Sequence, residues 1–432
     1  MASYVIIGGS AGAVGAVEAI REVDPRGDVI VISDEPHPAY SRPMIADYLS
    51  GETGPEKMLF PTKDFWDKHK VQMHFGKRAV KLDLLQKTVE LENAERISFD
   101  KLLIATGGKP SIPKVEGVTR KGVFTFTTIF DAQRIEEAIG KSEKAIVIGG
   151  GPIGVSATEA LAKCGLKVTI VELEDWILKL ILDQEAAKII ETAMQENGVS
   201  IITGHTVQRI LGRKEDDNAV GGVVLDNGIV IECDMVIVAI GVVPRTELAA
   251  QTDLKVNKGI LVDRSMQTSV PNVYACGDVA EAYDFIHKTH RVLALWPVAR
   301  IGGRVAGYNM AGQKCEYPGG TAMSALNYFG ISIISVGLTA INETEGYETL
   351  IFHNQEAGVY RKIVSKEGTV VGMTLVGDVE RAGIIFNLMK NQVKVEGFKH
   401  KLIADSFSLA SLPETLRKQI LFGAIQWKPL LA

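Results

Sequence analysis

Short apolar runs that end in glycine-rich turns mark the first part of the chain. Residues 5–7 (Val-Ile-Ile) lead into a glycine cluster at residues 8–12, and an alanine-rich stretch of helical character follows. A second run, residues 28–35, is almost continuously apolar and ends in Asp34 and Glu35, as in a strand buried on both faces. This pattern predicts a strand–turn–helix–strand unit of the parallel α/β type.

The same unit occurs again with a complete glycine fingerprint. Residues 145–162 read AIVIGGGPIGVSATEALA, and Gly149, Gly151 and Gly154 fulfil the spacing G-x-G-x-x-G. The first glycine allows a tight turn, the second lets the backbone approach a pyrophosphate, and the third allows close helix–strand packing. The N-terminus of the following helix then faces the phosphates. These residues predict a dinucleotide site.

A carboxylate in this second unit indicates which dinucleotide binds. Glu172 ends the strand at residues 167–172, at the position where a carboxylate accepts the ribose 2′-hydroxyl. Leu173 and Glu174 follow, and neither arginine nor lysine lies beside Glu172 to hold a 2′-phosphate. The sequence therefore favours NAD over NADP.

The first unit departs from the fingerprint, whose positions fall on Gly8, Ser10 and Ala13. Serine adds only a hydroxymethyl group and alanine only a methyl group, so a slightly wider turn can still receive a pyrophosphate. A tight turn without a ligand is the alternative. Two further segments favour nucleotide binding: LLIATGGKP at residues 102–110 and TSVPNVYACGDVA at residues 268–280, each a strand that runs into a small-residue turn.

Composition and charge narrow the functional class. The chain has 432 residues, of which 46% are hydrophobic and 23% charged, and its formal net charge of −5 argues against nucleic acid as a partner. No apolar run reaches the roughly 18 residues of a membrane span, and the first strand starts so early that we expect no signal or transit peptide. Four widely spaced cysteines predict neither a disulfide framework, nor a zinc site, nor an internal dithiol. We expect a cytoplasmic protein.

Together these motifs resemble the FAD-dependent pyridine nucleotide oxidoreductases related to glutathione reductase. The resemblance covers roughly residues 1–320 and includes ATGG at 105–108, GGGPIG at 149–154, VAIGVVPR at 238–245 and YACGD at 274–278. It implies an α/β fold with two Rossmann-like dinucleotide-binding domains, the NAD domain being inserted in the FAD domain, and a C-terminal α+β interface domain. The implied limits are 1–114 and 243–318 for the FAD domain, 115–242 for the NAD domain and 319–432 for the interface domain.

The resemblance also implies the residues of both cofactor sites. The implied FAD site consists of Gly8, Gly9, Ser10, Ala11, Ala13, Asp34, Glu35, Arg42, Pro43, Ala79, Ala105, Thr106, Gly107, Gly277, Asp278 and Trp296. The implied NAD site consists of Gly149, Gly151, Pro152, Ile153, Gly154, Glu172 and Gly241. Hydride transfer to a flavin needs no side-chain base, so we assign no catalytic residue and no metal ligand. His37, His287 and His290 are interpreted as loop histidines. Trp296 has core packing as its alternative role.

The segment after the first ribose acid defines the branch of the family. Residues 36–50 contain no cysteine, and Ser41 takes the place of a redox thiol. The stretch PAYSRP resembles the reductases of ferredoxin, rubredoxin and nitrite, in which the arginine, here Arg42, contacts the FAD diphosphate. That branch usually has a lysine paired to a glutamate near the flavin, but Asp47 and Ser156 stand at these positions. The pair is therefore not carried over.

A different pattern begins near Glu316. Residues 359–376 predict a hairpin with its turn at Glu367-Gly368, and residues 379–390 predict an amphipathic helix. Tyr328 and Phe329 fall where relatives bring this domain towards the flavin, with core packing as the alternative. The tail, residues 406–432, ends in an apolar group for which we expect docking on a partner surface. That group comprises Ile425, Trp427, Leu430 and Leu431.

The N-terminal turn, the PAYSRP stretch and the tail look most like flavin subunits of anaerobic complexes, such as the NAD-linked subunits of phenylglyoxylate dehydrogenase and tungsten aldehyde oxidoreductase. This resemblance implies a chain that moves electrons between NAD(H) and an iron–sulfur protein or subunit, in a homo- or hetero-oligomer. One alternative is a stand-alone NADH oxidase or an enzyme like nitrite reductase. Another is a non-catalytic nucleotide-sensing interaction module.

Overall fold

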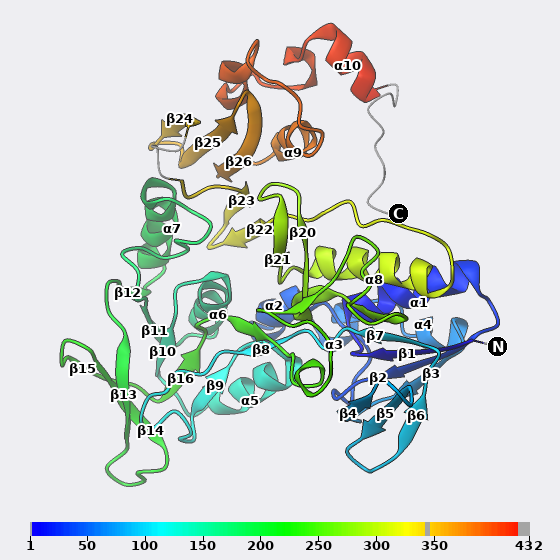
Figure 1. Cartoon of the computed structure of the whole chain (residues 1–432). Coiled ribbons are helices and arrows are strands. Elements are labelled where there is room, and N and C mark those ends of the chain that lie inside the picture. The colour runs from blue at the N-terminus through cyan, green and yellow to red at the C-terminus, as the bar shows by residue number, and fades with distance from the viewer. Residues whose placement is uncertain (1, 342–345, 422–432) are drawn as a thin grey trace.

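Two parallel sheets and one antiparallel sheet organise the chain (Figure 1). The computed structural model describes residues 2–341 and 346–421. The first parallel sheet has the strand order β19-β7-β1-β2-β3. Its strands are β1 (Ser3–Ile7), β2 (Asp28–Ile32), β3 (Val71–His74), β7 (Lys101–Ile104) and β19 (Val273–Ala275). The apolar runs of the sequence thus form buried neighbouring strands, as predicted.

Helices α1 (Ala11–Val23) and α8 (Trp296–Met310) pack against each other beside this sheet. Small residues permit the close approach, because a Cβ atom on Gly303 would lie 2.0 Å from the carbonyl oxygen of Gly12. A Cβ atom on Gly307 would likewise lie 2.4 Å from the carbonyl oxygen of Ala16. Any larger side chain at these positions would push α8 away from α1.

The second parallel sheet has the order β12-β11-β10-β16-β9. Its strands are β9 (Val123–Thr125), β10 (Lys144–Ile148), β11 (Lys167–Val171), β12 (Ser200–Ile202) and β16 (Met235–Val238). Its helices are α5 (Ile129–Ile139), α6 (Pro152–Lys163) and α7 (Gln184–Glu196). All these elements lie in sequence between β7 and β19 of the first sheet, so one Rossmann-like unit is inserted in the other, as predicted.

Shorter sheets surround the two units. They are formed by β4 (Ala79–Asp83), β5 (Thr88–Leu91) and β6 (Arg96–Ser98); by β8 (Gly108–Pro110) and β17 (Val242–Pro244); by β13 (Val207–Gly212), β14 (Val220–Leu225) and β15 (Val230–Glu232); and by β18 (Ile260–Leu261), β20 (Ala280–Asp284) and β21 (Thr289–Val292). The antiparallel pair β8–β17 carries the chain between the two units. In the described residues, no helix is long and apolar enough to cross a membrane.

The C-terminal part is an antiparallel sheet of order β22-β23-β26-β25-β24 with α9 and α10. Its elements are β22 (Met323–Tyr328), β23 (Ile331–Gly337), β24 (Tyr347–Asn354), β25 (Val359–Lys366), β26 (Thr369–Val376), α9 (Ala382–Lys390) and α10 (Glu414–Leu421). The predicted hairpin is confirmed, with Glu367 and Gly368 in left-handed conformations at its turn. The apolar group of the tail (Ile425, Trp427, Leu430 and Leu431) lies outside the described residues. The α/β fold class is confirmed, whereas the domain limits stay predictions.

This sheet is fastened to the second parallel unit by buried polar groups. The Tyr360 hydroxyl and the Lys362 ammonium group, both on β25, donate to the Asp183 carboxylate at 2.7 and 2.8 Å. Asp183 also caps α7 by accepting from the Ala186 amide at 3.1 Å. The Ser335 hydroxyl on β23 donates to the Ile181 carbonyl at 2.6 Å. The C-terminal sheet therefore holds the segment that follows the Glu172 position.

Candidate functional site

A cavity of about 390 Å³ lies at the carboxyl ends of the first sheet, where α/β folds bind ligands. Its walls come from the β1–α1 turn, the loops after β2, β7 and β19, the first turn of α6 and strand β22. Most residues of the implied FAD site line it: Gly8, Gly9, Ser10, Ala11, Asp34, Glu35, Arg42, Pro43, Ala105, Thr106, Gly107, Gly277, Asp278 and Trp296. Ala13 and Ala79 are buried in the structure and do not line the cavity.

Gly8 gives the β1–α1 turn its shape. Its φ is +114°, and a Cβ atom there would lie 2.1 Å from the carbonyl oxygen of Ala105. Ser10 is the N-cap of α1, and its side chain makes no capping hydrogen bond. The turn therefore offers the hydroxyl group and the free amides of the first turn of α1 to the cavity, which suits an anionic pyrophosphate.

The two glycine turns are equivalent in the fold. The Gly8 amide donates to the Ile32 carbonyl at 2.8 Å, and the Gly149 amide donates to the Val171 carbonyl at the same distance. At the last fingerprint position the turns differ, because a Cβ atom on Gly154 would lie 1.8 Å from the Gly149 carbonyl oxygen. Ala13 carries a Cβ atom at the equivalent position of α1. The first turn thus has its own geometry while keeping the same strand contacts.

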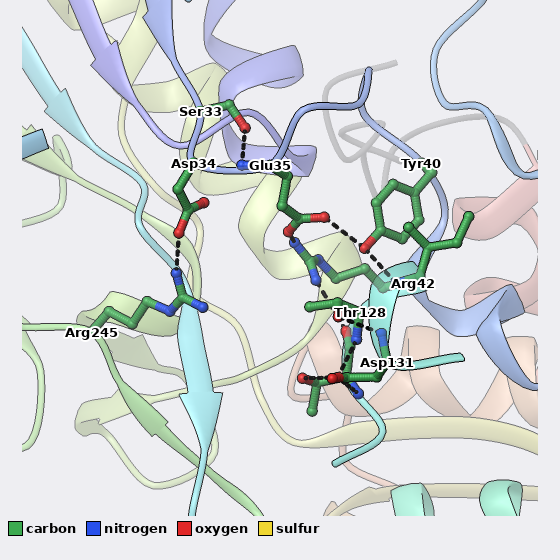
Figure 2. Close-up of polar contacts among 10 residues, drawn as sticks. Ser33, Asp34, Glu35, Tyr40, Arg42, Thr128, Asp131 and Arg245 are labelled. Carbon is green, nitrogen blue, oxygen red and sulfur yellow. Dashed lines mark hydrogen bonds and ion pairs between the residues drawn. The ribbon is translucent and has the colours of Figure 1, made fainter. Parts of the chain in front are cut away.

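The two acids after β2 each bind an arginine (Figure 2). The Glu35 carboxylate accepts from the Tyr40 hydroxyl at 2.8 Å and forms an ion pair with Arg42. Arg42 also donates to the Thr127 carbonyl at 3.0 Å, in the segment that precedes α5. Asp34 forms an ion pair with Arg245 at 2.7 Å, just after β17. The cavity is therefore bordered by charged side chains that are already paired.

Strand register shows which residue corresponds to Glu172. Ile32 pairs with Ile7 and Val171 pairs with Ile148, so Ser33 occupies the position equivalent to Glu172. Ser33 is uncharged, unlike Glu172. Its hydroxyl oxygen accepts a hydrogen bond from the Glu35 amide at 3.3 Å. Asp34 and Glu35 follow one and two residues later, so their role at a ribose stays a prediction.

Asp278 and Trp296 face the same cavity from the second half of the first unit. Burial raises the pKa of Asp278, an effect that Arg42 opposes. Trp296 packs edge-on against Phe60, with 4.5 Å between the ring centroids. Its indole Nε1 is buried and finds no hydrogen-bond acceptor among the residues that the structure describes. An orphaned donor on the cavity wall fits a ligand that supplies an acceptor, as a flavin does.

A second site surrounds the complete fingerprint. Gly149 has a φ of +105°, and a Cβ atom on it would lie 2.5 Å from the Ala239 carbonyl oxygen. Gly151 and Gly241 have open space where a Cβ atom would be, so a ligand can approach the backbone there. The Glu172 carboxylate accepts from the amides of Gly150 and Glu174. These features fit a dinucleotide, and the individual contacts to NAD stay predictions.

Ser156, one of the two positions where relatives are expected to carry a charged pair, makes a hydrogen bond between neutral groups. Ser156 lines the first cavity, together with Pro152 and Ile153, whereas Asp47 does not. The Ser156 hydroxyl donates to the Tyr328 hydroxyl at 3.3 Å. Burial raises the pKa of Asp47, and Glu52 adds to this effect. The sequence left two alternatives for Tyr328, a position near the flavin or packing in the core. In the structure Tyr328 lines the cavity.

Several cavity residues were missed by the sequence interpretation. Thr127 and Arg245 were not assigned a role, although Arg245 lies in the quoted motif VAIGVVPR. A basic residue at the end of that motif was the available signal. His37 also lines the cavity. The His287 ring shares a hydrogen bond with the Asp284 carboxylate at 2.9 Å and does not line the cavity.

Comparisons with known proteins agree with this geometry. Residues 2–303 match the family of pyridine nucleotide-disulphide oxidoreductases, and residues 323–393 match the C-terminal domain of rubredoxin NAD+ reductase. The chain is 32% identical over 410 residues to the NADH-dependent phenylglyoxylate dehydrogenase subunit epsilon of Aromatoleum evansii, covering 94% of this chain and 96% of that protein.

Two further similarities involve a curated protein and a solved structure. The assimilatory nitrate reductase electron transfer subunit of Bacillus subtilis (strain 168) is 30% identical over 367 residues, or 84% of this chain and 46% of that protein. The structure of a NAD-dependent persulfide reductase from A. fulgidus superposes with a TM-score of 0.85 at 26% identity, covering 98% of this chain and 83% of that one. The interpretation as a non-catalytic module is therefore set aside. The chain belongs to the pyridine nucleotide-disulphide oxidoreductase family, as an FAD-dependent NAD(H) oxidoreductase of the ferredoxin-reductase type.

Proposed function

We propose that this chain exchanges electrons between NAD(H) and an iron–sulfur protein or subunit, as the flavin subunit of a larger complex. The observation that carries the proposal is the state of the thiol beside the cofactor cavity. Cys276 has an exposed fraction of 0%, and burial, with a further contribution from Asp278, raises the pKa of its thiol to about 12. A protonated and inaccessible thiol does not relay electrons.

The other cysteines do not replace it. Ser41 occupies the segment after β2 where disulfide reductases carry a thiol, and Cys164, Cys233 and Cys315 do not line the cavity. Electrons that reach the flavin therefore have no thiol route through the part of the chain that the structure describes. Their acceptor or donor, other than NAD(H), is then a separate molecule.

Bound FAD supplies the chemistry that couples a hydride donor to a one-electron partner. The residues of this chain bind and orient the cofactors. Across residues 2–341 and 346–421 no group of three or more His, Cys, Asp or Glu side chains could hold a metal ion, so an iron–sulfur cluster would lie on the partner. Two relatives support a subunit role, since one is a subunit of an NADH-dependent dehydrogenase and the other an electron transfer subunit. Assembly as a homo- or hetero-oligomer and a cytoplasmic location stay predictions.

Native purification tests the proposal. The chain, tagged at its chromosomal locus, is isolated anaerobically from its source cells, and co-purifying chains, iron and acid-labile sulfide are measured. We expect a stable partner that carries iron and sulfide and is reduced through this chain by NADH. A chain that emerges alone and free of metal, and that consumes NADH with dioxygen alone as fast as with added cluster protein, would instead be a stand-alone oxidase.

A further inference from the structure

The two cofactor sites share one wall. Pro152, Ile153 and Ser156 belong to the first turns of α6 and line the flavin cavity. The same helix begins directly after Gly149 and Gly151 of the NAD fingerprint. A displacement of this helix end would therefore change how one cofactor lies against the other. The residues that fix this end matter for any reaction between the two cofactors.

Tyr328, at the end of β22, is bonded to this helix end. Its hydroxyl donates to the Pro152 carbonyl at 2.8 Å and accepts from the Ser156 hydroxyl at 3.3 Å. The residue is 3% exposed, and it reaches α6 from a strand 172 positions away from Ser156. Because each hydroxyl donates once, the two groups form a directed chain that ends on the backbone of the NAD turn.

The next residue supplies a second attachment. The Phe329 amide donates to the Glu159 carboxylate at 3.1 Å, one turn further along α6. Phe329 has a φ of +50°, in the left-handed region, at the β22–β23 turn. The β22–β23 turn thus contacts α6 through the Tyr328 hydroxyl and through the Phe329 amide. Of these two residues, Tyr328 also lines the flavin cavity.

The hydroxyl of Tyr328 stays uncharged near neutral pH. Burial raises its pKa to about 12, while the hydrogen bond from Ser156 lowers it and Glu159 raises it. The wall between the two cofactor sites is therefore neutral at Ser156 and Tyr328. Its contribution to reactivity is geometric and does not depend on a titrating group at this position.

We propose that Tyr328 is a positioning residue for hydride transfer: by fixing the first turn of α6, it sets the nicotinamide end of NAD(H) against the flavin. The proposal rests on the reaction with NAD(H) within the proposed function and is independent of the iron–sulfur partner. Hydride transfer depends steeply on the alignment of donor and acceptor, so a loosened helix end reduces the rate more than the affinity.

The test uses the full-length flavoprotein and anaerobic stopped-flow reduction by NADH. The variants are Tyr328→Phe, Ser156→Ala and the double variant, with Tyr347→Phe as control, because Tyr347 lies on β24 and does not line the cavity. For Tyr328→Phe we expect a limiting reduction rate lowered about tenfold, with unchanged FAD content and an NAD+ dissociation constant close to that of the wild type. Ser156→Ala should add little to Tyr328→Phe, because the phenylalanine has already removed the acceptor of the Ser156 hydroxyl.

The outcomes separate this inference from the proposed function. A Tyr328→Phe variant that is reduced at the wild-type rate would overturn the inference. So would a rate loss that follows only a loss of FAD or a lower melting temperature, because that is the behaviour of a purely structural contact. A wild-type protein that NADH does not reduce would refute the enzyme assignment itself, whereas failure to find an iron–sulfur partner leaves this test unaffected.

Discussion

The Arg245 guanidinium donates to the Asp34 carboxylate at 2.7 Å, although the residues are 211 positions apart in the chain. The carbonyl oxygen of Arg245 also accepts from the Thr106 hydroxyl at 3.0 Å. The loops after β2, β7 and β17 thus meet at the edge of the cavity that most residues of the predicted FAD site line. The charge of Asp34, beside the cavity, is thus balanced by Arg245, which follows the inserted unit in the chain.

Replacing Arg245 by methionine should weaken FAD binding several-fold. The substitution leaves the Asp34 carboxylate without a counter-charge next to the predicted site of a negatively charged diphosphate. The two side chains are 34% and 45% exposed, so their pair contributes about 1 kcal/mol or less to folding and the melting temperature should change little. The measurement is titration of apoprotein with FAD at low and high salt. Arg96→Met, which removes a pair with Glu90 outside the cavity, is the control. Equal FAD affinities for both variants would contradict the expectation.

Replacing Gly8 by alanine should abolish FAD retention. The new methyl group would lie 2.1 Å from the Ala105 carbonyl oxygen, so the turn that is predicted to face the pyrophosphate has to move. Gly165→Ala is a matched control, because Gly165 also has a positive φ, +88°, but open space around it. The flavin-to-protein absorbance ratio after purification decides the matter. If Gly8→Ala retains full flavin, the first glycine turn is not the FAD turn.

Coenzyme preference should depend on the residues after β11. The Lys179 ammonium group forms ion pairs with Glu174 and Asp175 at 2.7 and 3.2 Å, so this lysine is already paired and is a poor partner for a 2′-phosphate. The double variant Glu172→Ala, Leu173→Arg should shift the ratio of kcat/KM values for NADH and NADPH towards NADPH by about tenfold or more. Steady-state kinetics with both coenzymes measures it. An unchanged ratio would show that the ribose is bound elsewhere.

Cys276 should be dispensable for electron transfer. Because its pKa of about 12 keeps the thiol protonated, the group should resist iodoacetamide in the folded protein up to at least pH 9 and react after unfolding. Cys276→Ala should keep most of the NADH-dependent reduction of artificial acceptors. Loss of that activity, with FAD still bound, would point to a redox thiol and against an external electron partner.

Local patterns predicted the strand–turn–helix units and the glycine turns, because each is encoded within about 30 residues of chain. The intact fingerprint at Gly149, the buried strands and the hairpin at Glu367 were predicted in this way. The insertion of one unit in the other followed from the family resemblance. Contacts between distant residues were not, since a single sequence holds no signal that Arg245 meets Asp34 or that Tyr328 meets Ser156. Glu172 and Ser33 are an intermediate case. Their equivalence follows from the length of the two strands, but Ser33 is uncharged, and the acids Asp34 and Glu35 stand one and two residues later.

Electrons from NADH should pass through the flavin to a separate iron–sulfur protein. The most direct test of this transfer reduces the purified flavoprotein anaerobically with one equivalent of NADH and then mixes it either with an oxidised iron–sulfur protein from the same cells or with air-saturated buffer. We predict loss of the visible flavin absorbance on reduction and a reoxidation that is much faster with the iron–sulfur protein than with dioxygen. Reoxidation by dioxygen that is as fast as, or faster than, reoxidation by any cluster protein would contradict the account.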